Sequence, residues 1–285
     1  MNLPTRNVSY ADPALDISVK AASTLPLQIS GSELSRGQRE IIWAAFRSHL
    51  ALRTWPDDVL NALIDSGYLR SYTDGALIYM ADAPCPDIHV ILSGVLEWGW
   101  ASADGARAVL EFIPPGEVVN LTAVLTDLRS VHNQRARGLT RLFHIPFRTV
   151  QDQLDRDPNL TASLLRLLAV RARDLFDRLG KLGLMSFRAR LAYQLIALGE
   201  RYGQPDRDGL SLGIRLSQED LAALLMASRQ HVNKELRWLI DQHIVRVRYG
   251  RITLLDIDRL RSISDGKVHT LVSQVPLHRP HPPSC

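Results

Sequence analysis

The sequence predicts an α+β fold, and three observations carry this prediction. Short β-type runs separated by glycine turns fill the chain from about residue 76 to residue 145. A long amphipathic helical pattern follows Asp157-Pro158-Asn159, and two capped helices with a basic hairpin occupy residues 215–255. In this order, the features predict an N-terminal antiparallel β-roll (jelly roll), a long dimerisation helix and a C-terminal winged helix-turn-helix.

Length and composition limit the classes of protein to consider. The 285 residues suit two modest domains with extensions, and a net charge of +4 is small for the whole chain. The two cysteines, Cys85 and Cys285, form no C-x-x-C motif, which indicates a reducing compartment and no cysteine-based metal site. No apolar run reaches membrane-spanning length and no signal pattern opens the chain. We therefore expect a cytoplasmic protein with no membrane partner.

Five segments are predicted along the chain. The first is polar without a sustained period, which predicts a flexible arm, and the last is rich in proline, which predicts a flexible tail. The segments are the arm 1–30, the sensor β-roll 31–157, the dimerisation helix 158–185, the winged helix-turn-helix 186–263 and the tail 264–285.

The sensor segment begins with two helices and continues with strands. An apolar stripe of Ile41, Ile42, Ala45 and Phe46 predicts the first helix, and Thr54 is expected to cap the second, with Pro56 in its first turn. The β-type runs are 76–80, 88–92, 95–100, 107–113 and 139–145. Turn signals separate them at Asp74-Gly75, Ser93-Gly94, Asp104-Gly105 and Pro114-Pro115-Gly116.

The long helix carries two apolar rows. One row keeps a heptad spacing over about three repeats and predicts a parallel homodimer; its members are Leu165, Leu168, Ala172, Leu175, Leu179 and Leu182. The second row is expected to pack on the β-roll and consists of Leu160, Leu164, Leu167 and Phe176. Gly183 and Ser186 predict a hinge, after which 187–202 forms another helix.

Residues 215–240 predict two short amphipathic helices joined by a tight turn. Ser217 with Asp220 gives a capping signal for the first helix, and Ser228 is expected to cap the second. The residues expected to pack the helices together are Leu221, Leu224, Leu225, Val232, Leu236 and Leu239. Side chains suited to base edges and phosphates occupy the remaining face: Arg229, Gln230, Asn233 and Lys234. This pattern is typical of a helix-turn-helix whose second helix enters the DNA major groove.

A basic β-hairpin follows these helices. Residues 244–248 and 251–255 alternate on either side of Tyr249-Gly250, and residues 229–251 contain six basic and two acidic side chains. A basic hairpin in this place predicts a wing, whose Arg248 and Arg251 contact phosphates. An ordinary surface hairpin is the alternative if the helices do not read DNA.

The order of β-roll, long helix and winged helix-turn-helix resembles the bacterial CRP/FNR family of transcription regulators, over roughly residues 50–262. Residues 228–234 are similar to the family's "SR-(Q/E)-x-V-x-(K/R)" recognition helix. The resemblance implies base-edge contacts by Arg229, Gln230 and Lys234, to which we add Asn233. Expected contacts to the DNA backbone come from Ser217, Gln218, Ser228, His231, Arg248 and Arg251. The predicted partners are double-stranded DNA, a second copy of the chain and RNA polymerase.

Two positions depart from the family's pattern. Gln230 stands where several members carry Glu, and an amide suited to adenine in place of an acceptor for cytosine predicts a different half-site. Met226 stands where members often carry Gly in the turn between the helices. Because a turn that needs a positive φ strains a non-glycine residue, we expect this turn to be built differently.

The resemblance also implies where a cyclic nucleotide would bind. A Gly-Glu pair on a short helix and an Arg-Ser/Thr pair about ten residues later hold the phosphate and the ribose. Alignment on Pro114-Pro115-Gly116 places Asn120-Leu121 at the Gly-Glu pair and leaves no arginine opposite. The alternative alignment pairs Gly116-Glu117 with Arg129-Ser130 at a longer spacing. We favour the first and expect no typical cyclic-AMP site.

Other sensing chemistries known in the family also lack their residues. Two distant cysteines cannot hold an iron–sulfur cluster, and the strand after Ser93-Gly94 contains no haem-ligating His or Cys. His89 is expected to be packed rather than to bind a ligand. Trp98 and Trp100 share a strand face and are expected to pack in the barrel wall, with stacking on a planar effector as the alternative. The sequence therefore identifies no effector, cofactor or metal.

Two other classes of function stay open. One is a ligand-binding signalling module that does not act through DNA. The other is a cupin-type metalloenzyme, although His89, Glu97, His132 and His144 form no His-x-His motif. The sequence has no nucleophile–base motif or phosphate-binding loop, so we predict no enzymatic activity.

Overall fold

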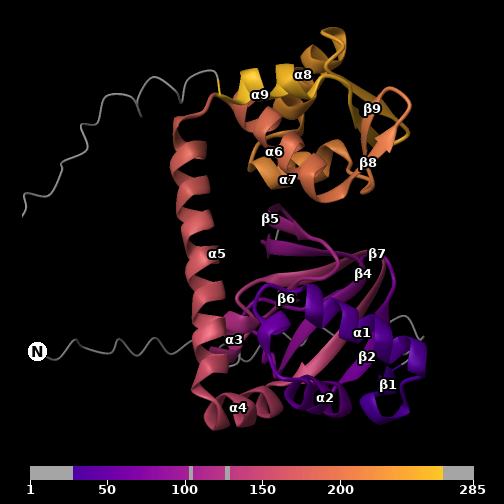
Figure 1. The fold of residues 1–285 in the computed structure, drawn as a ribbon. Coiled ribbons are helices and arrows are strands. Elements are labelled where there is room, and N and C mark those ends of the chain that lie inside the picture. Colours follow the sequence, from indigo (N-terminus) through magenta and orange to yellow (C-terminus); the bar gives the residue numbers. More distant parts are fainter. Residues whose placement is uncertain (1–27, 103–104, 126–128, 266–285) are drawn as a thin grey trace, which may run out of the picture.

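The computed structural model describes residues 28–102, 105–125 and 129–265 (Figure 1). Strand β1, Gln28–Ser30, pairs antiparallel with β2, Tyr68–Tyr72, so the predicted arm of 1–30 is too long by these three residues. Residues 1–27 of that arm lie outside the described residues. None of the described helices has both the length and the apolar composition needed to cross a membrane.

Two helices separate these strands. Helix α1, Arg36–Ser48, begins at a capping box of Ser35 and Gln38, and it buries Ile42 and Phe46. Helix α2 spans Asp57–Ser66 and follows Pro56 directly, so the prediction that Thr54 caps it is wrong. Thr54 is instead the last residue of a short 3₁₀ turn. Pro56 takes the N-cap position of α2, where its extended backbone leads into the helix and its missing amide hydrogen is not needed.

The sensor domain is an antiparallel β-roll. Its strands run in the order β1-β2-β7-β4-β5, with β3 paired to β7 and β6 to β4. The remaining bounds are β3 Leu77–Tyr79, β4 Asp87–Ala101, β5 Arg107–Ile113, β6 Val118–Val119 and β7 Asn133–Pro146. Sequence patterns missed β1, β2 and β6 and started β7 six residues late. These are short edge strands or strands whose polar residues interrupt the alternation.

Ser93-Gly94 is not a turn between two strands. It forms a bulge within the single strand β4, where the pairing with β7 shifts register on both sides of Ser93. Gly94 has a φ of +80°, and a Cβ there would lie 2.5 Å from Thr140 Oγ1, so only glycine fits the bulge. A glycine in a strand gives the same sequence signal as a hairpin turn, and only the pairing distinguishes them. Asp104, in the next predicted turn, lies outside the described residues.

Within the roll, the short helix α3, Leu121–Leu125, lies between β6 and β7. After the roll come α4 Phe147–Arg156, α5 Pro158–Leu184, which is the longest of the described helices, and α6 Phe187–Tyr202. Asp157 caps α5 and Ser186 caps α6. The two helices are separated by Met185 and Ser186, which have extended backbone conformations. Gly183 lies in the last turn of α5 and is therefore not part of the hinge.

The roll-facing row of α5 is shorter than predicted. Leu160, Leu164 and Leu167 are buried against the roll, whereas Phe176 is 71% exposed. Strand β5 reaches α5 as far as Arg178, whose Nη2 lies 3.6 Å from Glu111, so Phe176 is exposed because its side chain faces away from the roll. The expectation that Phe176 packs on the roll is therefore wrong.

The C-terminal domain combines a four-stranded sheet with the predicted helix pair. The sheet has the order β10-β11-β9-β8. Its elements are β8 Gly203–Asp206, β9 Gly209–Leu212, α7 Gln218–Leu225, α8 Arg229–Asp241, β10 Val245–Arg248, β11 Arg251–Leu254 and α9 Ile257–Asp265. Ser264 and Asp265 belong to α9, so the predicted tail of 264–285 begins two residues too early. The rest of that tail lies outside the described residues.

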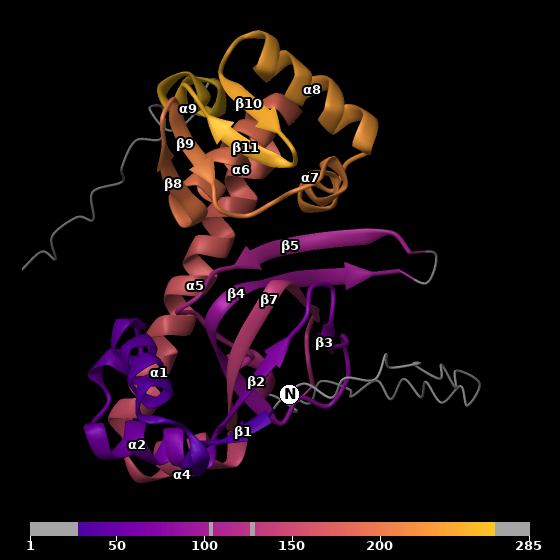
Figure 2. The same ribbon diagram turned by 90° about the vertical axis from the view of Figure 1, so that its right-hand side faces the viewer.

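The two domains meet along β5. Figure 2 shows β5 running beside α7, and the buried side chains of Val109 and Phe112 join the apolar core of the C-terminal domain. Glu111, between them, accepts a hydrogen bond from Arg201 on α6 and lies 3.6 Å from Arg178 Nη2 on α5. Strand β5 thus contributes both apolar surface and charge to the contact with the C-terminal domain.

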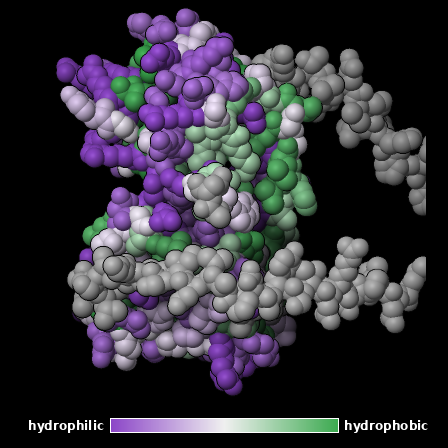
Figure 3. All heavy atoms as spheres, turned by 180° about the vertical axis from the view of Figure 1, so that it is seen from behind, coloured by the Kyte–Doolittle hydropathy of each residue, from purple (hydrophilic) through white to green (hydrophobic). Residues whose placement is uncertain are grey.

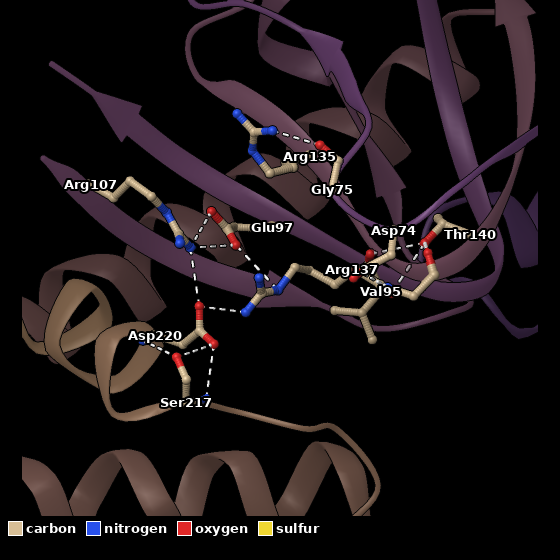
Figure 4. Close-up of polar contacts among 11 residues, drawn as sticks. Asp74, Gly75, Val95, Glu97, Arg107, Arg135, Arg137, Thr140, Ser217 and Asp220 are labelled. Atoms are coloured by element: carbon tan, nitrogen blue, oxygen red, sulfur yellow. Dashed lines mark hydrogen bonds and ion pairs between the residues drawn. The ribbon is translucent and has the colours of Figure 1, made fainter. Parts of the chain in front are cut away.

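A buried charge cluster adjoins this apolar contact (Figure 4). Asp220 Oδ1, in the first turn of α7, lies 2.5 Å from Arg137 Nη2 and 3.2 Å from Arg107 Nη2. Glu97 on β4 binds the same two arginines, at 3.4 Å and 2.9 Å. Asp220 Oδ2 accepts hydrogen bonds from the Ser217 amide and hydroxyl at 2.9 Å and 2.8 Å. The Asp220 carboxylate therefore hydrogen-bonds to the N-cap residue of α7 and also forms ion pairs with two arginines of the β-roll sheet.

The charge state of Asp220 follows from these contacts. Burial alone would raise its pKa, but hydrogen bonds from Ser217 and the charge of Arg137 outweigh burial and hold the pKa below its ordinary value. Asp220 therefore stays ionised at neutral pH and keeps both arginines.

We predict that Asp220→Asn lowers the free energy of unfolding by about 2 kcal/mol at pH 7, because it leaves two partly buried guanidinium groups with Glu97 alone. Urea unfolding measures this. Because the pKa of Asp220 is lowered in the folded protein, its ionisation stabilises the folded state fully above the unfolded-state pKa of about 3.9. This stabilisation is lost as the pH falls through the folded-state pKa. The difference between the two proteins is therefore expected to shrink below about pH 4.

The control is Asp258→Asn, which removes an exposed pair with Arg261 and is expected to cost less than about 0.5 kcal/mol. Equal losses for Asp220→Asn and Asp258→Asn would contradict a special role of the buried cluster.

Candidate nucleic-acid interface

The helix pair α7–α8 is built on caps and a shared apolar seam. Ser217 accepts a hydrogen bond from the Asp220 amide in a capping box, and Ser228 accepts one from the His231 amide. All the residues predicted to pack the helices together are buried: Leu221, Leu224, Leu225, Val232, Leu236 and Leu239. Their burial leaves one face of α8 for polar side chains.

The predicted base-edge residues share this face but differ in environment. Arg229, Gln230 and Lys234 are exposed, and Asn233 is half-buried. Arg229 Nη1 lies 3.3 Å from Glu219 Oε1, and Gln218 Nε2 donates to Asn233 Oδ1 at 3.2 Å. The sequence analysis missed both contacts, because they depend on how α7 crosses α8.

The predicted backbone-contact residues surround this face. Ser217 and Ser228 lie exposed at the two helix starts, and Gln218 is half-buried beside them. The exposed His231 stacks on Phe187 of α6, with ring centroids 3.9 Å apart. Its ring is therefore partly held by the protein, while its amide belongs to the N-terminal turn of α8.

The turn between the helices adopts the left-handed conformation despite its methionine. Met226 has φ 50° and ψ 50° and ends α7, with its amide bonded to Ala222 and Ala223 carbonyls. The expectation that a non-glycine residue forces a differently built turn is therefore wrong. The left-handed residue costs about 1 kcal/mol, which the buried seam between the helices outweighs.

The wing is a tight hairpin with a basic end. Tyr249 and Gly250 both have positive φ, of 51° and 74°, and connect Arg248 directly to its partner Arg251. Tyr249 is 99% exposed. Arg246 is bound to Asp206 and Asp208 across the sheet. Within the described residues, the cations of α8 and the wing without an ion pair are Lys234, Arg237, Arg248 and Arg251.

Helix α5 carries an exposed apolar strip. Figure 3 shows hydrophobic side chains along the edge of the molecule that α5 occupies. Leu165, Leu175 and Leu179 of the predicted heptad row are 67%, 43% and 58% exposed. Ala172 is also exposed, and Leu168 and Leu182 are half-buried. Phe176 extends this strip rather than the roll-facing row.

The interior of the β-roll contains a polar network. His89 Nε2 lies 3.0 Å from both Asn120 Nδ2 and Gln134 Oε1, and Gln134 Nε2 donates to Asn120 and Ser130 side chains. All four residues are buried. Burial and the nearby His144 lower the pKa of His89 to about 3, so its ring is neutral. Gln134 was not among the predicted site residues, although it is followed two positions later along β7 by Ala136, a spacing that places both side chains on one face of the strand.

The two tryptophans of β4 meet one histidine at the end of the roll. His132 stacks on Trp98 at 5.1 Å and meets Trp100 edge-on at 4.7 Å. Trp98 packs partly against the roll interior, while Trp100 is 42% exposed. The expectation of wall packing therefore describes Trp98 better than Trp100.

Comparison with known proteins matches both domains. The family model of the Crp-like helix-turn-helix domain matches residues 189–263, and that of the cyclic nucleotide-binding domain matches residues 69–157. A "CRP-like cAMP-activated global transcriptional regulator" of Mycobacterium tuberculosis is 24% identical over 65% of this chain and 83% of its own length. The chain belongs to the CRP/FNR family.

Solved structures of CRP/FNR regulators share the fold. A CRP/FNR-family regulator from Thermus thermophilus has a TM-score of 0.59 at 22% identity, covering 69% of this chain and 98% of its own. FixK2 from Bradyrhizobium japonicum has a TM-score of 0.61 at 20% identity, covering 68% and 96%. The resemblance proposed from residues 228–234 is confirmed.

The structure places the two segments that the sequence offered as a cyclic-nucleotide site. Asn120, with φ +70°, precedes the short helix α3, and the following Leu121, which the first alignment sets at the carboxylate position, is buried. Arg129 Nη1 donates to the Asp82 carbonyl at 2.5 Å. Asn120-Leu121 thus lies at the start of the short helix, whereas Gly116-Glu117 precedes β6. That the chain has no typical cyclic-AMP site stays a prediction of the first alignment.

A small cavity of about 40 Å³ lies where β5 meets α5 and α6, lined by Glu111, Arg178, Tyr193 and Arg201 among others. It has room for a few water molecules and not for a nucleotide. Among the described residues, no group of three or more His, Cys, Asp and Glu side chains is arranged to hold a metal ion. The structure thus adds no support to the cupin-type alternative.

We predict that His89→Gln flattens the pH dependence of stability between about pH 6.5 and pH 4. The unfolded chain protonates His89 near pH 6.5 while the folded protein does not, so wild-type stability falls with decreasing pH by up to ~1.4 kcal/mol per pH unit from this residue. Urea unfolding at several pH values measures the slope.

Asn120→Gly is the matched control, because it removes a contact of His89 and suits the positive φ while keeping the titrating ring. It is expected to lower stability and retain the wild-type slope. A wild-type slope in His89→Gln would refute the assignment.

Proposed function

We propose that this CRP/FNR-type transcription regulator reads its operator with the exposed face of α8. The observation that carries the proposal is the capped, buried helix pair, which leaves Arg229, Gln230, Asn233 and Lys234 on one outward face. Arginine and lysine suit guanine acceptors, and the amides suit adenine or guanine edges. The half-site is read by these four residues.

Phosphate contacts position this face on the duplex. Ser217, Gln218, Ser228 and His231 lie at the starts of α7 and α8, where unpaired amides and the helix dipole favour anions. Arg248 and Arg251, at the base of the exposed wing tip, contact the phosphates on the flank.

A homodimer through α5 presents two such faces. The exposed strip of Leu165, Leu175 and Leu179 repeats at heptad spacing and supports a parallel pairing. Two recognition helices related by a two-fold axis fit half-sites one helical turn apart. This arrangement favours a palindromic operator.

The sensor domain regulates the activity of the protein in transcription, and RNA polymerase is its partner there. Because the polar interior of the roll is filled by His89, Asn120 and Gln134, an effector of unidentified chemistry would have to displace them, or the protein acts constitutively. A regulator that reads DNA works beside the chromosome, so we infer a cytoplasmic location. The described surfaces give no reason to favour a signalling module that does not bind DNA, and no enzymatic role is proposed.

We predict that Arg229→Ala and Lys234→Ala each reduce affinity for the operator by about 10-fold or more, because each removes a base-edge or phosphate contact. Fluorescence anisotropy with a selected duplex measures the affinity. Wild-type affinity is also expected to fall steeply as salt rises, since phosphate binding releases counterions.

Arg36→Ala on the distant, exposed surface of α1 is the control and is expected to bind like wild type. Unchanged specific binding in both Arg229→Ala and Lys234→Ala would overturn the assignment of the recognition helix.

We predict that Leu179→Glu dissociates the dimer, because it places a charge in the middle of the apolar strip. Sedimentation equilibrium is expected to give a monomer mass, with operator affinity reduced at least about 10-fold through loss of bivalent binding. Arg173→Glu, also exposed on α5 but off the heptad row, is expected to remain dimeric. A dimeric Leu179→Glu protein would exclude this interface.

A further inference from the structure

The first turn of α7 holds two side chains of the recognition face of α8. Glu219 forms an ion pair with Arg229, and Gln218 donates a hydrogen bond to Asn233. The side chains of the Glu219–Arg229 pair are 70% and 66% exposed, so water and salt weaken that contact. Gln218 and Asn233 are half-buried. Their contact is therefore the one that fixes a recognition side chain before DNA arrives.

The geometry of Asn233 limits what its amide can present. Asn233 follows the fully buried Val232 and lies at the border between the helix seam and the exposed face. Its Oδ1 accepts the hydrogen bond from Gln218 Nε2 at 3.2 Å. The two ends of a carboxamide point in different directions, so anchoring Oδ1 against α7 directs Nδ2 away from α7. In the described part of the chain, no other hydrogen bond of this side chain is found.

We propose that Gln218 is a positioning residue that makes Asn233 a hydrogen-bond donor towards the major groove. The inference rests on the proposed function, because it concerns how the same face reads bases. A donor matches N7 and O6 of guanine and opposes the amino group of cytosine, whereas a freely rotating asparagine pairs with adenine through both ends. The operator position that faces Asn233 is therefore expected to prefer guanine and to reject cytosine.

Gln218 gains a second role in this arrangement. It lies at the first position of α7, where a phosphate would approach, and its Oε1 end is not used by the contact with Asn233. Its contribution is thus separable into positioning Asn233 and holding the backbone. Only the positioning role changes base preference at a single operator position.

The experiment is selection from randomised half-sites by the full-length protein, followed by sequencing of bound DNA. Asn233→Ala identifies the operator position, at which the preference is expected to disappear. Gln218→Ala is expected to reduce the guanine preference at that same position at least about threefold. The double variant is expected to match Asn233→Ala, because the two residues act as a unit.

Gln218→Glu gives the sharper test. A carboxylate only accepts hydrogen bonds, so Asn233 must turn Nδ2 towards it and Oδ1 towards the groove. The preference at this position is then expected to move from guanine to bases that present an amino group, cytosine or adenine. The added negative charge weakens binding to every sequence, so the readout is the ratio between sequences within each variant.

Gln218→Ala combined with Gln230→Ala is the matched control, because these residues are not in contact. Their effects are expected to fall on different operator positions and to multiply. A Gln218→Ala profile equal to wild type at the Asn233 position, or an unchanged base order in Gln218→Glu, would overturn the inference and leave the proposed function standing. Failure of the wild-type protein to select any sequence would overturn both.

Discussion

The arrangement of the two domains depends on burying the Asp220 carboxylate. This group accepts hydrogen bonds from Ser217 at the start of α7 and forms ion pairs with Arg137 and Arg107. Both arginines also form ion pairs with Glu97. A buried carboxylate without such partners would cost several kcal/mol. The first helix of the reading module is consequently tied to β4, β5 and β7. A rearrangement of those strands would act directly on α7 and, through the contact between Glu111 and Arg201, on α6.

Several short-range contacts hold the helix pair α7–α8 together. The buried seam of α7 and α8, two serine caps and the left-handed Met226 fix the angle between the helices. The Gln218–Asn233 contact extends that rigidity to a side chain of the recognition face. Preorganisation of this kind reduces the conformational entropy lost on binding, and it favours base discrimination over adaptable contact. In the wing, Arg246 of β10 pairs with Asp206 of β8 and with Asp208 in the turn that follows β8.

The β-roll domain has the family fold and a polar network in its interior. His89, Asn120, Gln134 and Ser130 are joined by hydrogen bonds inside the roll, although the buried Nδ1 of His89 has no partner among the described residues. Leu121, which the alignment on Pro114-Pro115-Gly116 sets at the carboxylate position of a cyclic-nucleotide site, is buried. A ligand entering this space would exchange its own hydrogen bonds for those of the network. The neutral His89 makes that network sensitive to acid rather than to small changes near neutral pH.

Sequence patterns alone determined the features set by neighbours along the chain. The caps at Ser217 and Ser228, the wing hairpin and the outward face of α8 follow from short-range hydrogen bonds and from periods of 2 and 3.6 residues. Tertiary structure decided what depends on distant partners, such as the bulge at Gly94 and the side-chain contacts between α7 and α8. Arg107 and Asp220 are 113 residues apart in the chain, and no local period relates them. The periodicity of a sequence predicts which face of a helix or strand a residue occupies. Which distant residue it contacts is decided only when the chain folds.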